Sequence, residues 1–332
     1  MKVGIPRALF YYYYFPFWKT FFESLGQEVV LSGPTNKKIL KDGIKTTVDD
    51  ACLPVKVFHG HVVELCKKTD VIFIPRIVSI EPGKYICPKF LGLPDMVKNN
   101  INGLPLIIDS ELNLYKSKQN IFKHIFEIGQ FFQKSKLQTF LAYCKARKKH
   151  KKYVEKIKKF GMISSVLERK DQNDIEKCDI EKSKYKKIML LGHPYNIFDH
   201  YINMNLIKKL QKNKIELITF EMVQENDIIK GSKKLNKQLF WTLGENILGS
   251  AYYYLDNKMV DGVIHVAAFG CGPDSLVGEL LEKRIAKEYK LPFLYINLDE
   301  QSGEAGFNTR LEAFLDILEG RNNFEGNISS HG

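Results

Sequence analysis

The sequence predicts an α/β protein with two open, mainly parallel sheets joined by a long basic helical connector. Three observations predict this fold. Apolar runs of strand length alternate with segments of helical periodicity in both halves of the chain. The run at residues 70–75 is continuously apolar after its first residue, which is typical of parallel strands covered on both faces. Between the halves, residues 116–159 hold 14 Lys or Arg and only two acids.

The length of the chain agrees with a division into two domains. At 332 residues it exceeds the roughly 100–200 residues of a typical domain. We expect an N-terminal α/β domain over residues 1–115, a basic connector and polar linker over 116–186, and a C-terminal α/β domain over 187–332. Both sheets are expected to be flavodoxin- or Rossmann-like, so that ligands bind beyond the carboxyl ends of the strands.

Individual elements follow from periodicity and from the Gly, Pro and polar residues that bound each run. The predicted strands are residues 2–6, 28–32, 70–75, 104–109, 188–192, 215–220, 261–269 and 292–298. The aromatic run at 11–17 suits a buried helix, although it contains Pro16. Further helices are predicted at 34–43, 55–67, 95–100, 120–132, 203–212, 235–255, 274–289 and 308–318, and a polar, aromatic loop at 193–199.

The basic charge is concentrated in one segment. The net charge is 50 − 38 = +12, and residues 116–159 alone contribute 14 − 2 = +12, so the rest of the chain is balanced. This distribution argues against nucleic acid as a partner. We interpret residues 145–159 as a solvated helical face, and residues 168–186, which are rich in both charges, as an exposed linker.

Composition also excludes several other classes. The chain has no apolar run of about 20 residues, so no membrane span is expected. No secretory cleavage pattern follows the N-terminus, which predicts a cytoplasmic protein whose six cysteines are not disulfide partners. The glycine patterns of phosphate-binding and dinucleotide-binding loops do not occur, so the chain itself is expected to bind no nucleotide.

Three cysteines lie in loops at or after predicted strand ends, namely Cys52, Cys87 and Cys271. Cys271 stands between Gly270 and Gly272 at a predicted strand-to-helix bend, where Asp274 can cap the helix or favour its dipole. The other three lie in a helical pattern, on the connector and in the polar linker: Cys66, Cys144 and Cys178.

Thiolates bind iron–sulfur clusters, zinc or copper(I), and three cysteines without a clear fourth ligand fit a four-iron cluster with one open iron. Spacing alone leaves separate buried cysteines as an alternative. Zinc is a second alternative, with His59, His61 or His265 as further ligands, although packing by His59 and His61 and a hydrogen-bonded core position for His265 are favoured. Catalytic candidates are Glu300, Glu304 and His193, but the acids equally suit a helix cap.

Several motifs together resemble the acyl-CoA dehydratase activase-related proteins. They are residues 4–9, 51–56 with 58–61, 74–76 with 86–90, 192–196, 269–274, and 303–306 with 309–314. These proteins are similar to the cluster-carrying subunits of 2-hydroxyacyl-CoA dehydratases. The chain shows neither a second dehydratase subunit nor the ATP-binding domain of an activase.

The resemblance implies that Cys52, Cys87 and Cys271 hold a [4Fe-4S] cluster in a cleft between the domains. A larger double-cubane cluster would need six well-placed cysteines, and only three lie in suitable loops. The implied partner is an ATP-dependent activase that supplies low-potential electrons for one-electron reduction or radical dehydration of an acyl-CoA or another small molecule. A homodimer or a dehydratase-like heterodimer is the implied assembly.

Two other functions remain open from the residues. A non-catalytic scaffold could dock an acidic partner on its basic connector, and neutralising Lys148, Lys149, Lys151 and Lys152 would then abolish a salt-sensitive association. A zinc-dependent hydrolase would contain one zinc ion and no iron.

Overall fold

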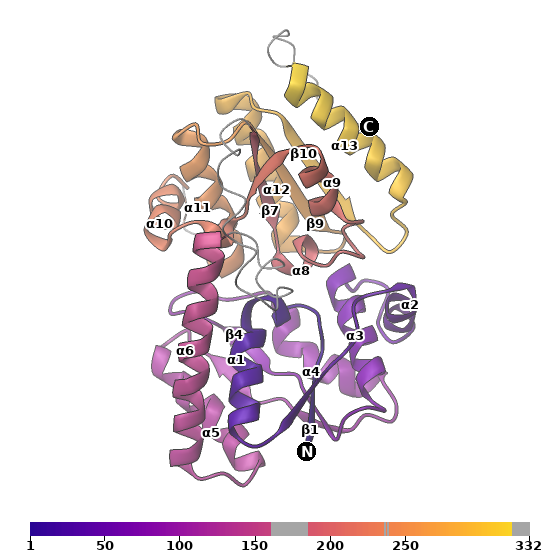
Figure 1. Ribbon diagram of the computed structural model, residues 1–332, viewed down its shortest axis with the longest axis vertical. Helices are drawn as coiled ribbons and strands as arrows, with labels where there is room; N and C mark the ends of the chain where they lie inside the picture. Colours follow the sequence, from indigo (N-terminus) through magenta and orange to yellow (C-terminus); the bar gives the residue numbers. More distant parts are fainter. Residues whose placement is uncertain (161–184, 236, 238, 321–332) are drawn as a thin grey trace.

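The computed structural model describes residues 1–160, 185–235, 237 and 239–320. It confirms the predicted α/β class, with parallel strands in each of its sheets. The N-terminal and C-terminal halves lie one above the other, and a long helix runs along one side of the molecule (Figure 1). The linker predicted at 168–186 falls almost wholly outside the described residues, as does Cys178. The domain boundaries stay a prediction.

The first sheet has the strand order β2-β1-β3-β5. Its central strand β1 pairs with two neighbours, so that Val3 lies between Val29 and Val71 in register. Val3 and Val71 are fully buried, as the continuous apolar pattern predicts. The four strands are β1 (Lys2–Ile5), β2 (Glu28–Leu31), β3 (Val71–Phe73) and β5 (Leu106–Ile108).

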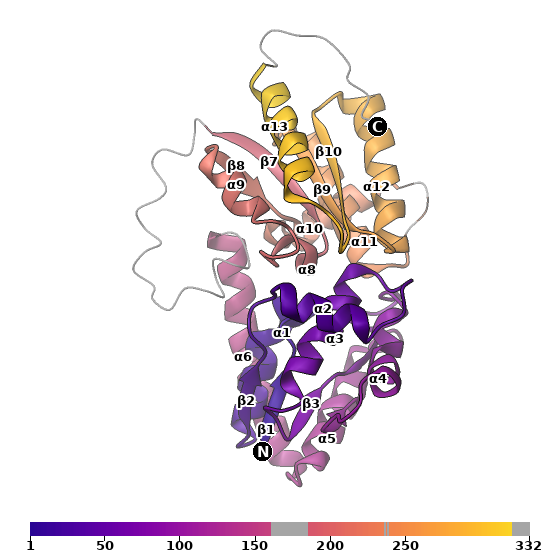
Figure 2. The ribbon, with the colours of Figure 1, turned by 90° about the vertical axis from the view of Figure 1, so that its right-hand side faces the viewer.

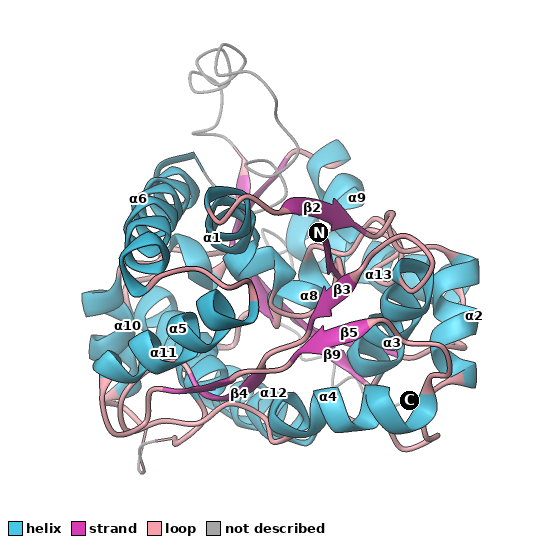
Figure 3. Cartoon of the chain, turned by 90° about the horizontal axis from the view of Figure 1, so that it is seen from below, coloured by secondary structure: helices cyan, strands magenta, loops and turns pink. Residues whose placement is uncertain are grey.

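Helices cover both faces of this sheet. Seen from below, α1 and α5 lie on one side of the strands and α3 lies on the other (Figure 3). The helices of this half are α1 (Tyr11–Ser24), α2 (Lys37–Lys45), α3 (Leu53–Leu65), α4 (Lys89–Asn100), η1 (Lys118–Asn120) and α5 (Ile121–Phe131).

The second sheet has the strand order β10-β9-β7-β8 and is likewise parallel. Strand β9 is buried along its whole length, because it pairs on both sides and carries helices on its faces. This sheet and its helices face the first half across the molecule (Figure 2). Its elements are β7 (Lys186–Gly192), α8 (Pro194–Ile197), α9 (Leu206–Lys212), β8 (Ile215–Ile218), η4 (Phe220–Met222), α10 (Glu225–Ser232), α11 (Thr242–Asp256), β9 (Gly262–Ala268), α12 (Gly272–Arg284), the π-helical turn η5 (Ile285–Tyr289), β10 (Phe293–Leu298) and α13 (Glu304–Gly320).

The predicted helix at 235–255 was wrong at its start, because α11 begins only at Thr242. Trp241 is extended, and the backbone around it pairs with Tyr85 of the first half. The helix predicted at 95–100 begins earlier, at Lys89, and Pro94 lies inside it. The loop predicted at 193–199 contains α8. Two short strands, β4 (Arg76–Ser79) and β6 (Glu111–Asn113), escaped prediction because each is only three or four residues long and carries charged residues.

The connector helix α6 (Lys136–Phe160) is attached to α1 at the position of Pro16. Proline has no N–H group, so the carbonyl of Tyr12, four residues earlier, lacks its helical partner. The buried hydroxyl of Tyr153 on α6 donates a hydrogen bond of 2.7 Å to this carbonyl. A proline that would interrupt a helix therefore becomes an anchoring point for the connector.

The basic residues of the connector lie mainly on the outer face of α6. Ala142, Ala146, Tyr153 and Ile157 are buried against the first half. In contrast, Lys145, Lys148, Lys149 and Lys152 are exposed, as a solvated helical face requires. Whether this face binds a partner stays a prediction. None of the described helices is long and apolar enough to cross a membrane.

Helices α2 and α3 approach each other through two glycines. A Cβ atom built on Gly43 would lie 1.8 Å from the carbonyl oxygen of Lys56, and one on Gly60 would lie 1.9 Å from that of Ile39. Both contacts are with backbone atoms, which cannot turn aside. The two helices can therefore pack this closely only because neither position carries a side chain.

Three fully buried histidines lie in the first half, namely His59, His61 and His124. Burial lowers the pKa of His59 and of His61 to about 4, and that of His124 to about 3. In the unfolded chain each would titrate near its ordinary value of about 6.5. The folded protein therefore holds these rings neutral at neutral pH.

We expect the protein to lose stability as the pH falls below about 6.5. The three histidines then bind protons in the unfolded chain but stay neutral in the folded protein. The loss of stability continues until the pH reaches the lowered pKa values of the folded protein. Burial raises the pKa of Glu221 to about 7, which offsets part of this loss. Urea unfolding should give a free energy about 2 to 4 kcal/mol lower at pH 5 than at pH 7.

The matched variant is His124→Phe, whose ring suits the contacts with Trp18 and Phe73. Its stability should fall less steeply with acid, by about 1.4 kcal/mol per pH unit. An unchanged slope in this variant would show that His124 does not contribute to the acid sensitivity.

Candidate active site between the two halves

One cavity is lined by Cys52, Cys87 and Cys271 together. The first two come from the N-terminal half and the third from the C-terminal half. The cavity encloses about 550 Å³ including its open mouth, but only about 30 Å³ is wide enough for the centre of a water molecule. Its other walls are mainly apolar and include Tyr195 and Trp241. The carboxyl ends of strands from both sheets thus meet here, as expected for parallel sheets.

Each of the three cysteines stands where a helix begins. Cys52 is the N-cap of α3, Cys271 is the N-cap of α12, and Cys87 precedes Pro88, the N-cap of α4. The carbonyl groups of the cysteines accept the first helical hydrogen bonds, for example from Val55 to Cys52 at 2.9 Å. Three helix N-termini therefore direct the positive ends of their dipoles toward the thiols, which favours negative charge there.

The turn before Cys271 brings the two halves into contact. Gly270 has a φ of +77°, in the left-handed region that favours glycine. A Cβ atom at this position would lie 3.4 Å from the Cα atom of Cys52. The turn therefore lies directly against the Cys52 backbone, and this contact brings Cys271 to the N-terminal half.

Burial raises the pKa of the Cys52 and Cys87 thiols above its ordinary value. The neighbouring thiols raise the pKa further, because three negative charges in one apolar cavity repel one another. The charge of Lys89 acts in the opposite direction on both thiols. Three thiolates at this place consequently need a positive charge among them.

Two histidines and a carboxylate form a buried network behind Cys271. Nδ1 of His193 lies 3.1 Å from one oxygen of Asp274, and Nε2 of His265 lies 3.0 Å from the other. Asp274 and His265 are fully buried. His193 also lines the cavity, together with Cys271.

The electrostatics of this network favour an ion pair. Burial alone would lower the pKa of His193, but the Asp274 carboxylate and Cys271 raise it well above its usual value. Burial likewise opposes the charge of Asp274, yet His193 and His265 hold its pKa well below the ordinary range. The ligand atoms of His193, Cys271 and Asp274 all lie within 4.8 Å of one another.

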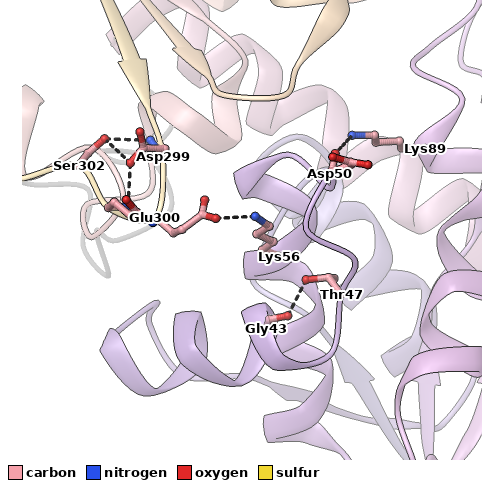
Figure 4. A network of polar contacts seen from close by, with 9 residues as sticks. Gly43, Thr47, Asp50, Lys56, Lys89, Asp299, Glu300 and Ser302 are labelled. Atoms are coloured by element: carbon pink, nitrogen blue, oxygen red, sulfur yellow. Dashed lines mark hydrogen bonds and ion pairs between the residues drawn. The ribbon is translucent and has the colours of Figure 1, made fainter.

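Contacts on two sides of the cavity hold the halves together. On one side, the buried Lys56 of α3 forms an ion pair of 2.5 Å with Glu300, which lies in the loop after β10 (Figure 4). On the other side, Tyr85 receives a hydrogen bond from Thr242 and donates one to Phe240, at 2.9 and 2.7 Å. Phe240 and Thr242 flank Trp241, so this backbone pairing fixes one wall of the cavity.

The other residues singled out from the sequence lie elsewhere. Glu300 pairs with Lys56, and Glu304 pairs with Lys209 at 2.7 Å. Neither glutamate lines the cavity. His59 and His61 lie on α3 away from the cavity walls, while His265 contacts Asp274 as a hydrogen-bonded core residue. Cys66 is the C-cap of α3, and Cys144 is exposed on α6.

Two features of the site do not follow from the sequence. The sequence predicts a capping or dipole role for Asp274, whereas its bonds to His193 and His265 join positions 81 and 9 residues away. It also predicts a loop at Tyr195, whereas this residue belongs to α8 and lines the cavity. The signal that could have indicated both is the polar and aromatic sequence at 193–199 directly after an apolar strand.

Comparison with protein families assigns most of the chain. Residues 2–223 match the family described as the CoA enzyme activase uncharacterised domain, and this match covers more than half of the chain. The chain belongs to this activase-domain family. Residues 242–318, which include Cys271, match the 2-hydroxyglutaryl-CoA dehydratase D-component. The resemblance expected from the sequence motifs is confirmed.

Other comparisons add little to the activase-domain assignment. No curated protein sequence matches the chain. Among solved structures, one titled "Crystal structure of ZnuA" is 10% identical, covers 96% of this chain and 98% of its own, and has a TM-score of 0.28. A TM-score of this size does not indicate a common fold.

Proposed function

We propose that this protein is an iron–sulfur protein of the 2-hydroxyacyl-CoA dehydratase type. Cys52, Cys87 and Cys271 would hold a [4Fe-4S] cluster between the halves, and an ATP-dependent activase would deliver low-potential electrons for one-electron reduction or radical dehydration of a thioester. The observation that carries the proposal is the meeting of three thiols, from three separate segments, in one cavity.

The residues present fit such a group. Thiolates are the preferred ligands of iron–sulfur clusters, and the cavity supplies three of them among mainly apolar walls. The helix N-termini at the cysteines and the charge of Lys89 favour the negative charge of thiolates. When bound, the cluster would supply a one-electron carrier with one iron not ligated by a protein cysteine.

The chain's own residues would perform three tasks around this group. The apolar walls would exclude water, which strengthens every electrostatic interaction within the cavity. His193, held by Asp274 and close to the Cys271 sulfur, would help to orient this ligand. The paired contacts of Lys56 with Glu300 and of Tyr85 with Thr242 would keep the cysteines of the two halves together.

Zinc-dependent hydrolysis is a second candidate, because His193, Cys271 and Asp274 form a possible metal-binding group. This donor set is less suitable for zinc than three thiols are for iron. Both oxygens of Asp274 already bond to histidines, and Nδ1 of His193 is one of their partners. Metal analysis of protein prepared without oxygen separates the candidates, since one zinc without iron would support the second.

The direct test is anaerobic reconstitution with iron and sulfide, followed by iron analysis and visible spectroscopy. The wild-type chain should bind iron and sulfide in equal amounts, and Cys52→Ser, Cys87→Ser and Cys271→Ser should each lose most of this iron. Cys66→Ser and Cys144→Ser are matched controls, since neither residue lines the cavity. Equal loading of all five variants would exclude the proposed ligand set.

A further inference from the structure

We propose that Tyr195 binds the ligand of this cavity by donating its phenolic O–H to a carbonyl oxygen of an acyl thioester. The inference rests on the proposed function and deepens it, because it assigns a recognition group for the reacting end of the substrate. Tyr195 belongs to α8, the short helix that follows β7.

The backbone before Tyr195 explains how it reaches the cavity. Gly192 ends β7 with a φ of +141°, and a Cβ atom there would lie 2.2 Å from the carbonyl oxygen of Val266 on β9. Only a glycine lets the two strands approach in this way. Pro194 then opens α8 directly after His193, so the chain turns at the carboxyl end of the strand.

Packing fixes the ring of Tyr195. Its plane lies parallel to the His193 ring, with a centroid distance of 5.1 Å and an interplanar angle of 6°. The Phe90 ring lies at 6.3 Å. Because His193 is itself bonded to Asp274, the phenol is supported by a side chain that is held in place. The ring is buried, with 7% of its surface exposed.

The hydroxyl of Tyr195 is available to a ligand. Within the described part of the chain this hydroxyl has no protein partner, although buried tyrosine hydroxyls usually have one. The oxygen is not fully shielded from solvent. Because Tyr195 lines the cavity together with the three cysteines, we place this hydroxyl at the cavity.

The chemistry of the side chain makes this hydroxyl a donor. A phenol has an ordinary pKa of about 10, so it carries a proton that it can donate at neutral pH. A ligand that pairs with this donor must offer a hydrogen-bond acceptor. The carbonyl oxygen of a small acyl group is such an acceptor, and the group suits the narrow space between the cavity walls.

The test compares wild type, Tyr195→Phe and the control Tyr143→Phe after anaerobic reconstitution. Tyr143 packs against Phe17 and Phe122 and does not line the cavity. The probes are lactoyl-CoA, a small 2-hydroxyacyl thioester, and its thioether analogue without the carbonyl oxygen. Binding is followed by the electron paramagnetic resonance of the reduced protein and by the fluorescence of Trp241, which lines the cavity.

We expect equal iron contents and a loss of about 3- to 10-fold in lactoyl-CoA affinity for Tyr195→Phe alone. The thioether should bind all three proteins equally. Equal thioester affinities, an equal loss for both probes, loss of iron from Tyr195→Phe, or a wild type that does not prefer the thioester would each overturn the inference. A wild type that takes up no iron would instead refute the proposed function itself.

Discussion

An alanine at position 60 is expected to destabilise the protein by about 3 kcal/mol, at the upper end of the usual cost of overpacking. The added methyl group would lie 1.9 Å from the Ile39 carbonyl oxygen, so α2 must move away from α3. The better helix propensity of alanine recovers only about 1 kcal/mol. Urea unfolding of Gly60→Ala at neutral pH measures the effect.

The same substitution should also affect the cavity, because α3 begins at Cys52. A shift of α3 moves the Cys52 sulfur relative to the other two, and we expect lower iron uptake in reconstitution. Gly306→Ala is the matched control. Gly306 lies on α13, and a Cβ atom there meets nothing within 4 Å. If Gly60→Ala were as stable as this control, the close packing of α2 and α3 would not be needed.

Removing the carboxylate of Asp274 is expected to cost about 3 to 5 kcal/mol, because it leaves a buried charge without its partner. His193 and His265 would both lose the acceptor that they share. The variant is Asp274→Ala, and the measurement is the free energy of unfolding in urea. Glu312→Ala, at an exposed position on α13, should change this free energy by less than about 0.5 kcal/mol.

Asp274→Asn distinguishes shape from charge at this position. The amide keeps the volume and one acceptor oxygen, so it should recover part of the lost stability. If Asp274→Ala unfolds at the same urea concentration as wild type, the two histidines find other partners, and the network has no structural importance.

The parallel strands could be predicted because local pattern determines them. Residues 262–269 are apolar except for His265, and the strand found there, β9, is buried throughout. Helix starts were harder to predict where another part of the chain intervenes. Helical periodicity suggested a helix from residue 235, but pairing with Tyr85 keeps Trp241 extended, and no local pattern reports a partner more than 150 residues away.

The candidate site divides in the same way. Loop position separated Cys52, Cys87 and Cys271 from the other cysteines, and family resemblance joined them; the structure has them line one cavity. The bonds of Asp274 and the orientation of Tyr195 could not be predicted, because they depend on how β7 and β9 align. The alignment of two strands forms only in the folded sheet. The periodicity of a single strand carries no information about it.

The division of the cavity between the two halves also has a consequence for biosynthesis. Cys271 follows Cys87 by 184 residues, since 271 − 87 = 184, so it leaves the ribosome about 9 to 37 s later at ~5–20 residues per second. During this interval the chain contains two of the three cavity cysteines, Cys52 and Cys87, but not Cys271. A growing chain therefore presents an incomplete set of ligand thiols to the cell. A metal centre that needs all three can form only after β9 and Cys271 have been translated.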